Sequence, residues 1–140
     1  MHGQMIRSAV FIASIAGLYL SAAMLVPAAV DFYYANQDWQ VFTISAFVVG
    51  TVCLAAAMAT RGANANFSRR LGFLVVNLLW ITLAVAGAIP LYMSSLGLGV
   101  ADALFESVSA VTTTGATVIS TLDSAPPGLL IWRSLLQWIG

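Results

Sequence analysis

The sequence contains no lysine and few charged residues of any kind. Of its 140 residues, 7% are charged and 61% are hydrophobic, whereas a soluble domain carries roughly 25% charged residues. The five basic residues are arginines, and five acidic residues balance them, so the net charge is zero. This composition excludes an ordinary soluble domain, argues against nucleic-acid binding and predicts a membrane protein.

The sequence also lacks the residues from which disulfides and most catalytic centres are built. Its one cysteine, Cys53, lies in an apolar run, so no intramolecular disulfide is possible and we expect a small core residue. The acids Asp102, Glu106 and Asp123 have no nucleophile, metal ligand or second histidine arranged with them. We therefore do not expect an enzyme.

Three apolar segments are long enough to cross a membrane: residues 8–30, 41–60 and 71–93. A transmembrane helix needs about 20 such residues to cross a hydrocarbon core of ~30 Å. The first segment exceeds the roughly 7–15 apolar residues of a cleaved signal peptide, so we expect it to be kept as a helix. Residues 1–65 are predicted to form an N-terminal transmembrane helix pair.

The fourth apolar segment, residues 101–111, is too short to span and predicts a re-entrant pore helix that enters from the outside. Asp102 near its start would cap free amide groups, and the partial negative charge of its inner end would favour a cation. Residues 128–140 would make a helix shorter than the hydrocarbon core, so we expect an incomplete last helix and a fragment of a longer protein. The predicted fold is all-α, with residues 66–140 as one helix–pore-loop–helix unit.

Between these two segments lies the loop 112–118, with the sequence Thr-Thr-Thr-Gly-Ala-Thr-Val. Threonines broken by a glycine make a poor helix, and Gly115 permits a positive φ. Non-helical backbone at membrane depth survives only where it is buried in protein or lines a wet cavity. Oxygen-rich loops of this kind build cation selectivity filters, although an ordinary re-entrant turn without ion contact is the plainer alternative.

An ordered set of segments resembles the first pore unit of the TrkH-type subunit, the potassium-translocating subunit of the bacterial Trk system in the Trk/Ktr/HKT superfamily. The segments are 103–109, 112–118, 122–123, 127–130 and 132–138. The resemblance covers about residues 71–140, and the two preceding helices fit the same subunits by hydropathy alone. One glycine in the loop, followed by Ala116 and Thr117, fits the Trk pattern and departs from that of potassium channels.

The resemblance implies four such units in one chain, with potassium (K⁺) as the transported ion. It also implies a homodimer in the bacterial inner membrane and a cytosolic nucleotide-binding regulatory partner of the TrkA type. The backbone carbonyls expected to bind the ion are those of Thr113, Thr114, Gly115 and Ala116. The residues expected to support the filter are Thr112 and Thr117, by hydrogen bonds that hold the loop, together with Glu106 and Arg133.

The position of Glu106 on an apolar half-helix leaves three interpretations open. Intramembrane acids are expensive and usually partnered. Glu106 either accepts hydrogen bonds from backbone amides behind the filter, or pairs with Arg133, or is exposed in an outer vestibule. For Arg133, snorkelling to the outer interface competes with a role in supporting the filter.

Two other functions compete with the transporter interpretation. A pore-loop cation channel could assemble from several copies of this unit, although the short final helix argues against it. A non-conducting membrane accessory subunit would explain the small size but would leave the threonine–glycine loop unexplained.

The distribution of arginines predicts the orientation in the membrane. Arg7 and the triple-arginine gap (Arg61, Arg69, Arg70) should face the cytoplasm, because short cytoplasmic loops carry an excess of basic residues. The gap with Asp31 and Asp38 should face outside, near an aromatic belt of Tyr33, Tyr34, Trp39 and Tyr92.

Cysteine labelling in a Cys53→Ser background tests this orientation. We expect a cysteine placed at Ala63 to resist an impermeant external reagent in intact cells, since the triple-arginine gap should face the cytoplasm. Labelling from outside would overturn the orientation.

Overall fold

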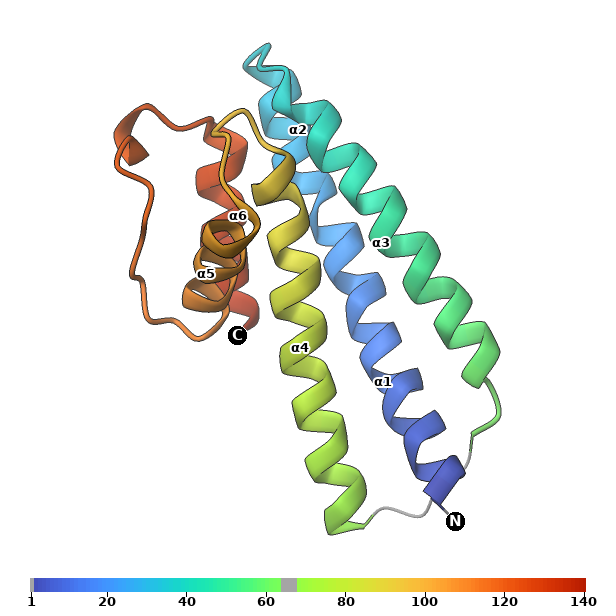
Figure 1. Ribbon diagram of the computed structural model, residues 1–140. Helices are drawn as coiled ribbons and strands as arrows, with labels where there is room; N and C mark the ends of the chain where they lie inside the picture. The colour runs from blue at the N-terminus through green and yellow to red at the C-terminus, as the bar shows by residue number, and fades with distance from the viewer. Residues whose placement is uncertain (1, 64–67) are drawn as a thin grey trace.

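The protein is built from helices (Figure 1), as predicted. The structure is a computed structural model that describes residues 2–63 and 68–140, and over those residues it has no strand. The elements, in chain order, are α1 (His2–Ala23), α2 (Leu25–Tyr33), α3 (Asp38–Thr60), α4 (Arg69–Met93), α5 (Val100–Val111), a 3₁₀ turn η1 (Leu122–Ser124) and α6 (Pro127–Ile139).

Three helical segments are long and apolar enough to cross a membrane: Gly3–Tyr33, Asp38–Thr60 and Arg69–Met93. Their bounds lie close to those predicted from hydropathy. Large apolar side chains point outward from them: Phe47 and Phe73 are each 72% exposed. A surface of this kind is suited to lipid or to further membrane helices rather than to water, so the predicted membrane protein is confirmed.

The first span is interrupted, whereas the sequence predicts one helix over residues 8–30. It divides at Met24 into α1 and α2. Pro27 explains the break, because proline has no N–H to donate to the carbonyl of Ala23 and its ring crowds that carbonyl. The amide of Met24 still bonds Leu20 O at 3.1 Å and that of Ala28 bonds Met24 O at 3.3 Å, so the helix path continues through the break.

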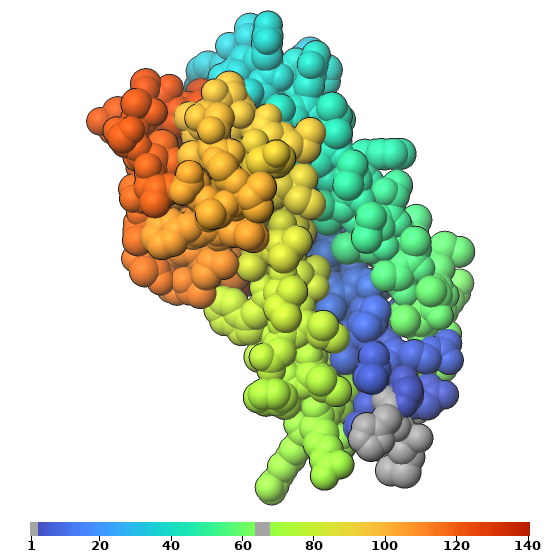
Figure 2. All heavy atoms as spheres, viewed as in Figure 1, coloured from blue at the N-terminus to red at the C-terminus, as the bar shows by residue number. Residues whose placement is uncertain are grey.

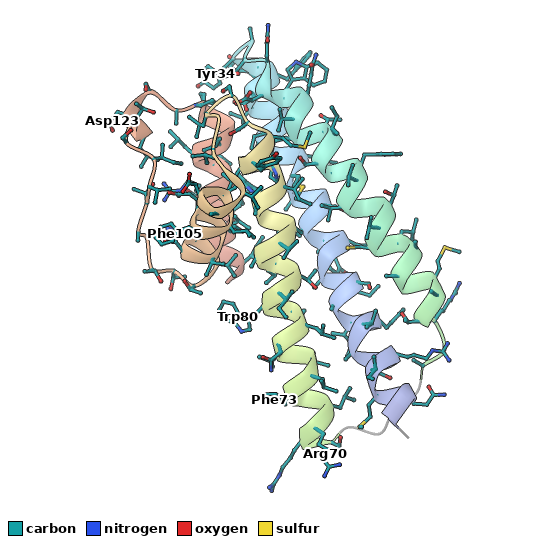
Figure 3. All side chains as sticks on the ribbon, viewed as in Figure 1. Tyr34, Arg70, Phe73, Trp80, Phe105 and Asp123 are labelled. Atoms are coloured by element: carbon teal, nitrogen blue, oxygen red, sulfur yellow. The ribbon has the colours of Figure 1, made fainter. Side chains whose placement is uncertain are left out.

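The two polar gaps predicted between the spans, one with aspartates and one with arginines, lie at opposite ends of the molecule. Tyr34 is at one end and Arg70 at the other (Figure 3). Asp31 and Asp38 lie on the helices flanking the α2–α3 turn, at the same end as Tyr34. They are 0% and 4% exposed, so both carboxyl groups are buried in the protein at that end. The predicted boundary between residues 65 and 66 lies outside the described residues.

Helices α5 and α6 lie beside one half of α4 (Figure 1), and the arginine-bearing half of α4 projects beyond them (Figure 2). Gly87 of α4 is the point of closest approach. The Ser107 hydroxyl donates to Ala84 O at 2.7 Å, and Trp132 Nε1 donates to Gly87 O at 3.0 Å. A β-carbon at Gly87 would lie 2.6 Å from Ser107 Oγ and 3.0 Å from a Leu136 methyl. Helices α4, α5 and α6 therefore approach closely at this point, because Gly87 has no side chain to separate them.

Adding one methyl group at Gly87 should therefore destabilise the protein. We expect Gly87→Ala in the full-length protein to lower stability by about 1–3 kcal/mol, the usual effect of overpacking. Gly72→Ala, on the same helix, is the matched control, because none of the described residues lies within 4 Å of its added β-carbon. Thermal unfolding in detergent measures both, and equal melting temperatures for the two variants would contradict the close packing at Gly87.

Candidate functional site

The predicted filter loop is an exposed segment between α5 and the turn η1 (Figure 1). Residues 112–118 are all exposed, and two of them have left-handed backbone: Thr113 with φ of +57° and Gly115 with φ of +76°. The positive φ at Gly115 confirms the expectation from its missing side chain. Thr113 was not expected to share it, because a β-branched residue resists this region.

The C-terminal end of α5 holds the first half of the loop. The amide of Thr113 donates to Ala110 O and that of Thr114 to Ser109 O, each at 2.9 Å. The Thr112 hydroxyl donates to Val108 O at 2.7 Å and lies 2.8 Å from the Thr114 hydroxyl. The Thr112 side chain thus bonds to the end of α5 and lies against that of Thr114, which is consistent with the predicted role in holding the loop.

The four carbonyls predicted to face an ion are not equivalent. The Ser109 hydroxyl donates to Ala116 O at 2.6 Å, so this carbonyl is already engaged with α5. Among the described residues, no donor reaches the carbonyls of Thr113, Thr114 or Gly115. Three carbonyls in a row are therefore available, and that of Ala116 is the weakest of the four candidates.

The second half of the loop is held by Glu106, which is 0% exposed. Its Oε1 accepts the Thr117 hydroxyl and the Val118 amide, both at 2.6 Å. The Thr117 hydroxyl accepts in turn from the Ile119 amide at 3.0 Å. Exposure of Glu106 in a vestibule is therefore wrong, and the predicted support of the loop by Thr117 is present.

The other carboxylate oxygen of Glu106 meets Arg133 of α6. Arg133 Nε lies 2.9 Å from Glu106 Oε2, and neither atom has a hydrogen-bond partner among the described residues. The contact is thus an ion pair held mainly by charge. The Arg133 side chain is 11% exposed, so snorkelling to the interface is wrong. The two remaining interpretations of Glu106, amide acceptor and ion-pair partner, hold together.

Two features of the site were not predicted. Ser109 binds the loop through both of its polar groups: its carbonyl accepts from the amides of Thr114 and Gly115, and its hydroxyl donates to Ala116 O. Its only sequence signal is a small polar residue in an apolar helix. The start of α5 also differs, because Gly99 occupies the N-cap and no side chain caps the helix. Asp102 lies in the first turn, where it complements the helix dipole but does not cap.

Comparison with known proteins gives one family. The family profile TrkH, described as a cation transport protein, matches residues 39–140. The chain is similar to the Trk system potassium uptake protein TrkH of Halomonas elongata, with 38% identity over 125 residues, which are 88% of this chain and 26% of the relative. The corresponding protein of Escherichia coli K12 is 36% identical over 124 residues, with the same shares.

A comparison with solved structures agrees with this family. The chain is similar to the crystal structure of the potassium transporter TrkH from Vibrio parahaemolyticus, with a TM-score of 0.88 and 36% identity over 95% of this chain and 29% of that one. The chain therefore spans about a quarter of the length of the curated relatives it matches.

The ion pair behind the loop can be tested by a double-mutant cycle in the full-length protein. Arg133→Gln leaves a buried carboxylate without its counter-charge, a change that typically costs about 3–5 kcal/mol. Glu106→Gln keeps an oxygen that can accept from Thr117 and Val118 but leaves Arg133 without its counter-charge. We expect each single variant to lower the yield of folded protein, and the double variant to lose less than the sum. Strict additivity would show that the two residues are uncoupled.

Proposed function

This chain belongs to the TrkH family of cation transport proteins, and from that membership we propose that it supplies one pore unit of a potassium-uptake transporter. Potassium is the transported ion because the similar proteins of Halomonas elongata and Escherichia coli are named as potassium uptake proteins. A cation transporter of this kind is not an enzyme.

The observation that carries the proposal is the row of unengaged carbonyls at Thr113, Thr114 and Gly115 in a loop whose flanks are tightly held. Carbonyl oxygens replace the hydration shell of an ion in a filter. They can do so only if they do not already accept hydrogen bonds from amide or hydroxyl groups of the protein. Ser109 and Thr112 hold one side of the loop and Glu106 holds the other, which leaves those three carbonyls for the ion. The Ala116 carbonyl would complete the set with its second lone pair.

The helix before the loop adds an electrostatic contribution. Helix α5 (Val100–Val111) ends directly before Thr112, so its partial negative charge lies where the cation would be held. No formal charge is needed among the ion ligands, and the buried carboxylate behind the loop, Glu106, is neutralised by Arg133. Such a site attracts a monovalent cation without binding it too tightly to release.

One unit supplies one segment of a filter ring, so the remaining ligands must come from elsewhere. The relatives are about four times as long as this chain, which supports three further pore units in the same full-length protein rather than several copies of this one. The proposal includes the division into a helix pair (1–65) and a pore unit (66–140), a homodimer, and a regulatory partner of the TrkA type. It places the protein in the bacterial inner membrane with a cytoplasmic N-terminus.

The test is Gly115→Ser in the full-length protein. In the part of the chain that the structure describes, nothing lies within 4 Å of the added β-carbon. The expected effect therefore comes from the positive φ, which a serine resists by about 1–2 kcal/mol. Turning that peptide should misdirect the carbonyls beside it. We expect a lower affinity for rubidium and a narrower preference over sodium, measured as uptake of both ions at matched amounts of protein.

Gly97→Ser is the matched control. Gly97 also has a positive φ, of +66°, and open space at its β-carbon, but it precedes α5 and lies outside the loop 112–118. It should reproduce the backbone strain without changing the ion preference. Unchanged rubidium affinity and sodium exclusion in Gly115→Ser, or equal changes in both variants, would remove the filter assignment.

A further inference from the structure

Asp31 is a buried acid that the proposed ion pathway does not use. It lies on α2 with 0% of its surface exposed, and its Oδ1 accepts the Gly128 amide at 2.7 Å. Its Oδ2 is buried without a hydrogen-bond partner among the described residues. A carboxylate in this state lowers stability, so its presence calls for an explanation other than stability.

The first turn of α6 leaves a single amide for Asp31 to satisfy. Pro126 and Pro127 have no N–H. The amides of Leu129 and Leu130 both donate to Pro126 O, at 3.0 and 3.2 Å. Only the Gly128 amide remains, and the carboxylate that receives it comes from a helix 97 positions away in sequence. Asp31 therefore acts as an N-terminal cap for α6 that is supplied by another part of the chain. Its negative charge also interacts favourably with the positive end of the helix dipole.

The contact also depends on the absence of a side chain at Gly128. A β-carbon built there would collide with the carboxyl group of Asp31. Helices α2 and α6 are thus in close contact at this point, and the place where α6 begins is set by Asp31.

The same helix carries the counter-charge of the filter support. Arg133 follows Gly128 by five residues, a rise of about 7.5 Å along a helix, and meets Glu106, which holds Thr117 and Val118. A shift of α6 along its axis would move the guanidinium from the carboxylate, and the loop is bonded to that carboxylate.

We propose that Asp31 is a positioning residue for ion selection: by fixing the start of α6, it sets where Arg133 meets Glu106 and hence how the loop 112–118 is held. This inference rests on the proposed function. It assigns to the N-terminal helices a direct part in the geometry of the filter.

The experiment measures rubidium and sodium uptake by the full-length protein at matched amounts in the membrane. Asp31→Leu removes the acceptor for the Gly128 amide. It should raise the rubidium KM on the order of two- to thirtyfold, the range for residues that modulate a distant site, and narrow the preference over sodium. Asp31→Asn keeps an oxygen for Gly128 and should retain the parental KM.

Two further variants control for loss of folding. Asp38→Leu removes the other buried aspartate at the same end; the Asp38 carboxylate accepts from the Ser95 hydroxyl at 2.8 Å and, among the described residues, accepts no hydrogen bond from α6. It should lower the amount of protein without changing the KM. Gly128→Ala displaces the same contact by one methyl group and should shift the KM as Asp31→Leu does, so it replaces that variant if Asp31→Leu does not accumulate.

A last experiment tests whether Asp31 acts on the loop through the ion pair of Arg133 and Glu106. When Asp31→Leu or Gly128→Ala is added to a Glu106→Gln, Arg133→Gln background, its effect on the rubidium KM should shrink, because the ion pair through which it acts is gone. Equal effects in both backgrounds, an unchanged KM in Gly128→Ala, or the same shift in Asp38→Leu would overturn the inference. If Gly115→Ser still alters selectivity in those cases, the proposed function stands and only the role of Asp31 falls.

Discussion

The buried carboxylate of Glu106 is the constraint on which the rest of the pore unit depends. A charge with no exposed surface must be neutralised by groups held at fixed positions. Here there are three such groups: a hydroxyl and an amide from the loop, at Thr117 and Val118, and a guanidinium from α6. One side chain therefore ties α5, the loop and α6 together, and none of the three can move without leaving the charge unpaired.

This constraint can be met only if the helices approach closely. Gly87 lets α5 and α6 reach the backbone of α4, and Trp132 fills the space beside it, with its ring 6.1 Å from that of Phe42. Small residues at membrane helix contacts serve this purpose, because dispersion and interhelical hydrogen bonds replace the hydrophobic effect there. The apolar packing thus sets the distances between the helices, and the polar contacts set how the helices are placed along one another.

The sequence predicted those features that depend on local composition. Hydropathy was enough to find three spans and the short α5, since length and apolarity decide whether a helix crosses a membrane. It was enough to place the loop, because Gly115 and the threonines disfavour a helix. It did not give the positive φ of Thr113, which arises from the bonds that Ala110 and Ser109 make with the loop. It also did not give the burial of Asp31, because an aspartate at the end of a hydrophobic run normally faces water. Its burial depends on α6, whose distance along the chain left no local signal.

The path of contacts from Asp31 to the loop bears on why two helices precede the pore unit at all. If α1, α2 and α3 served only to occupy membrane, their contacts with α6 would be apolar and exchangeable, as lipid-facing contacts are. Instead α2 places a carboxylate against the first turn of α6, and α3 places Asp38 against the loop before α5. Each buried charge is costly in a membrane, and each meets a point where the chain enters or leaves the pore segment. Of the two contacts, that of Asp38 holds the loop before α5, whereas that of Asp31 falls on α6, the helix whose Arg133 pairs with Glu106. The contact of Asp31 is therefore the one that bears on the geometry of the filter.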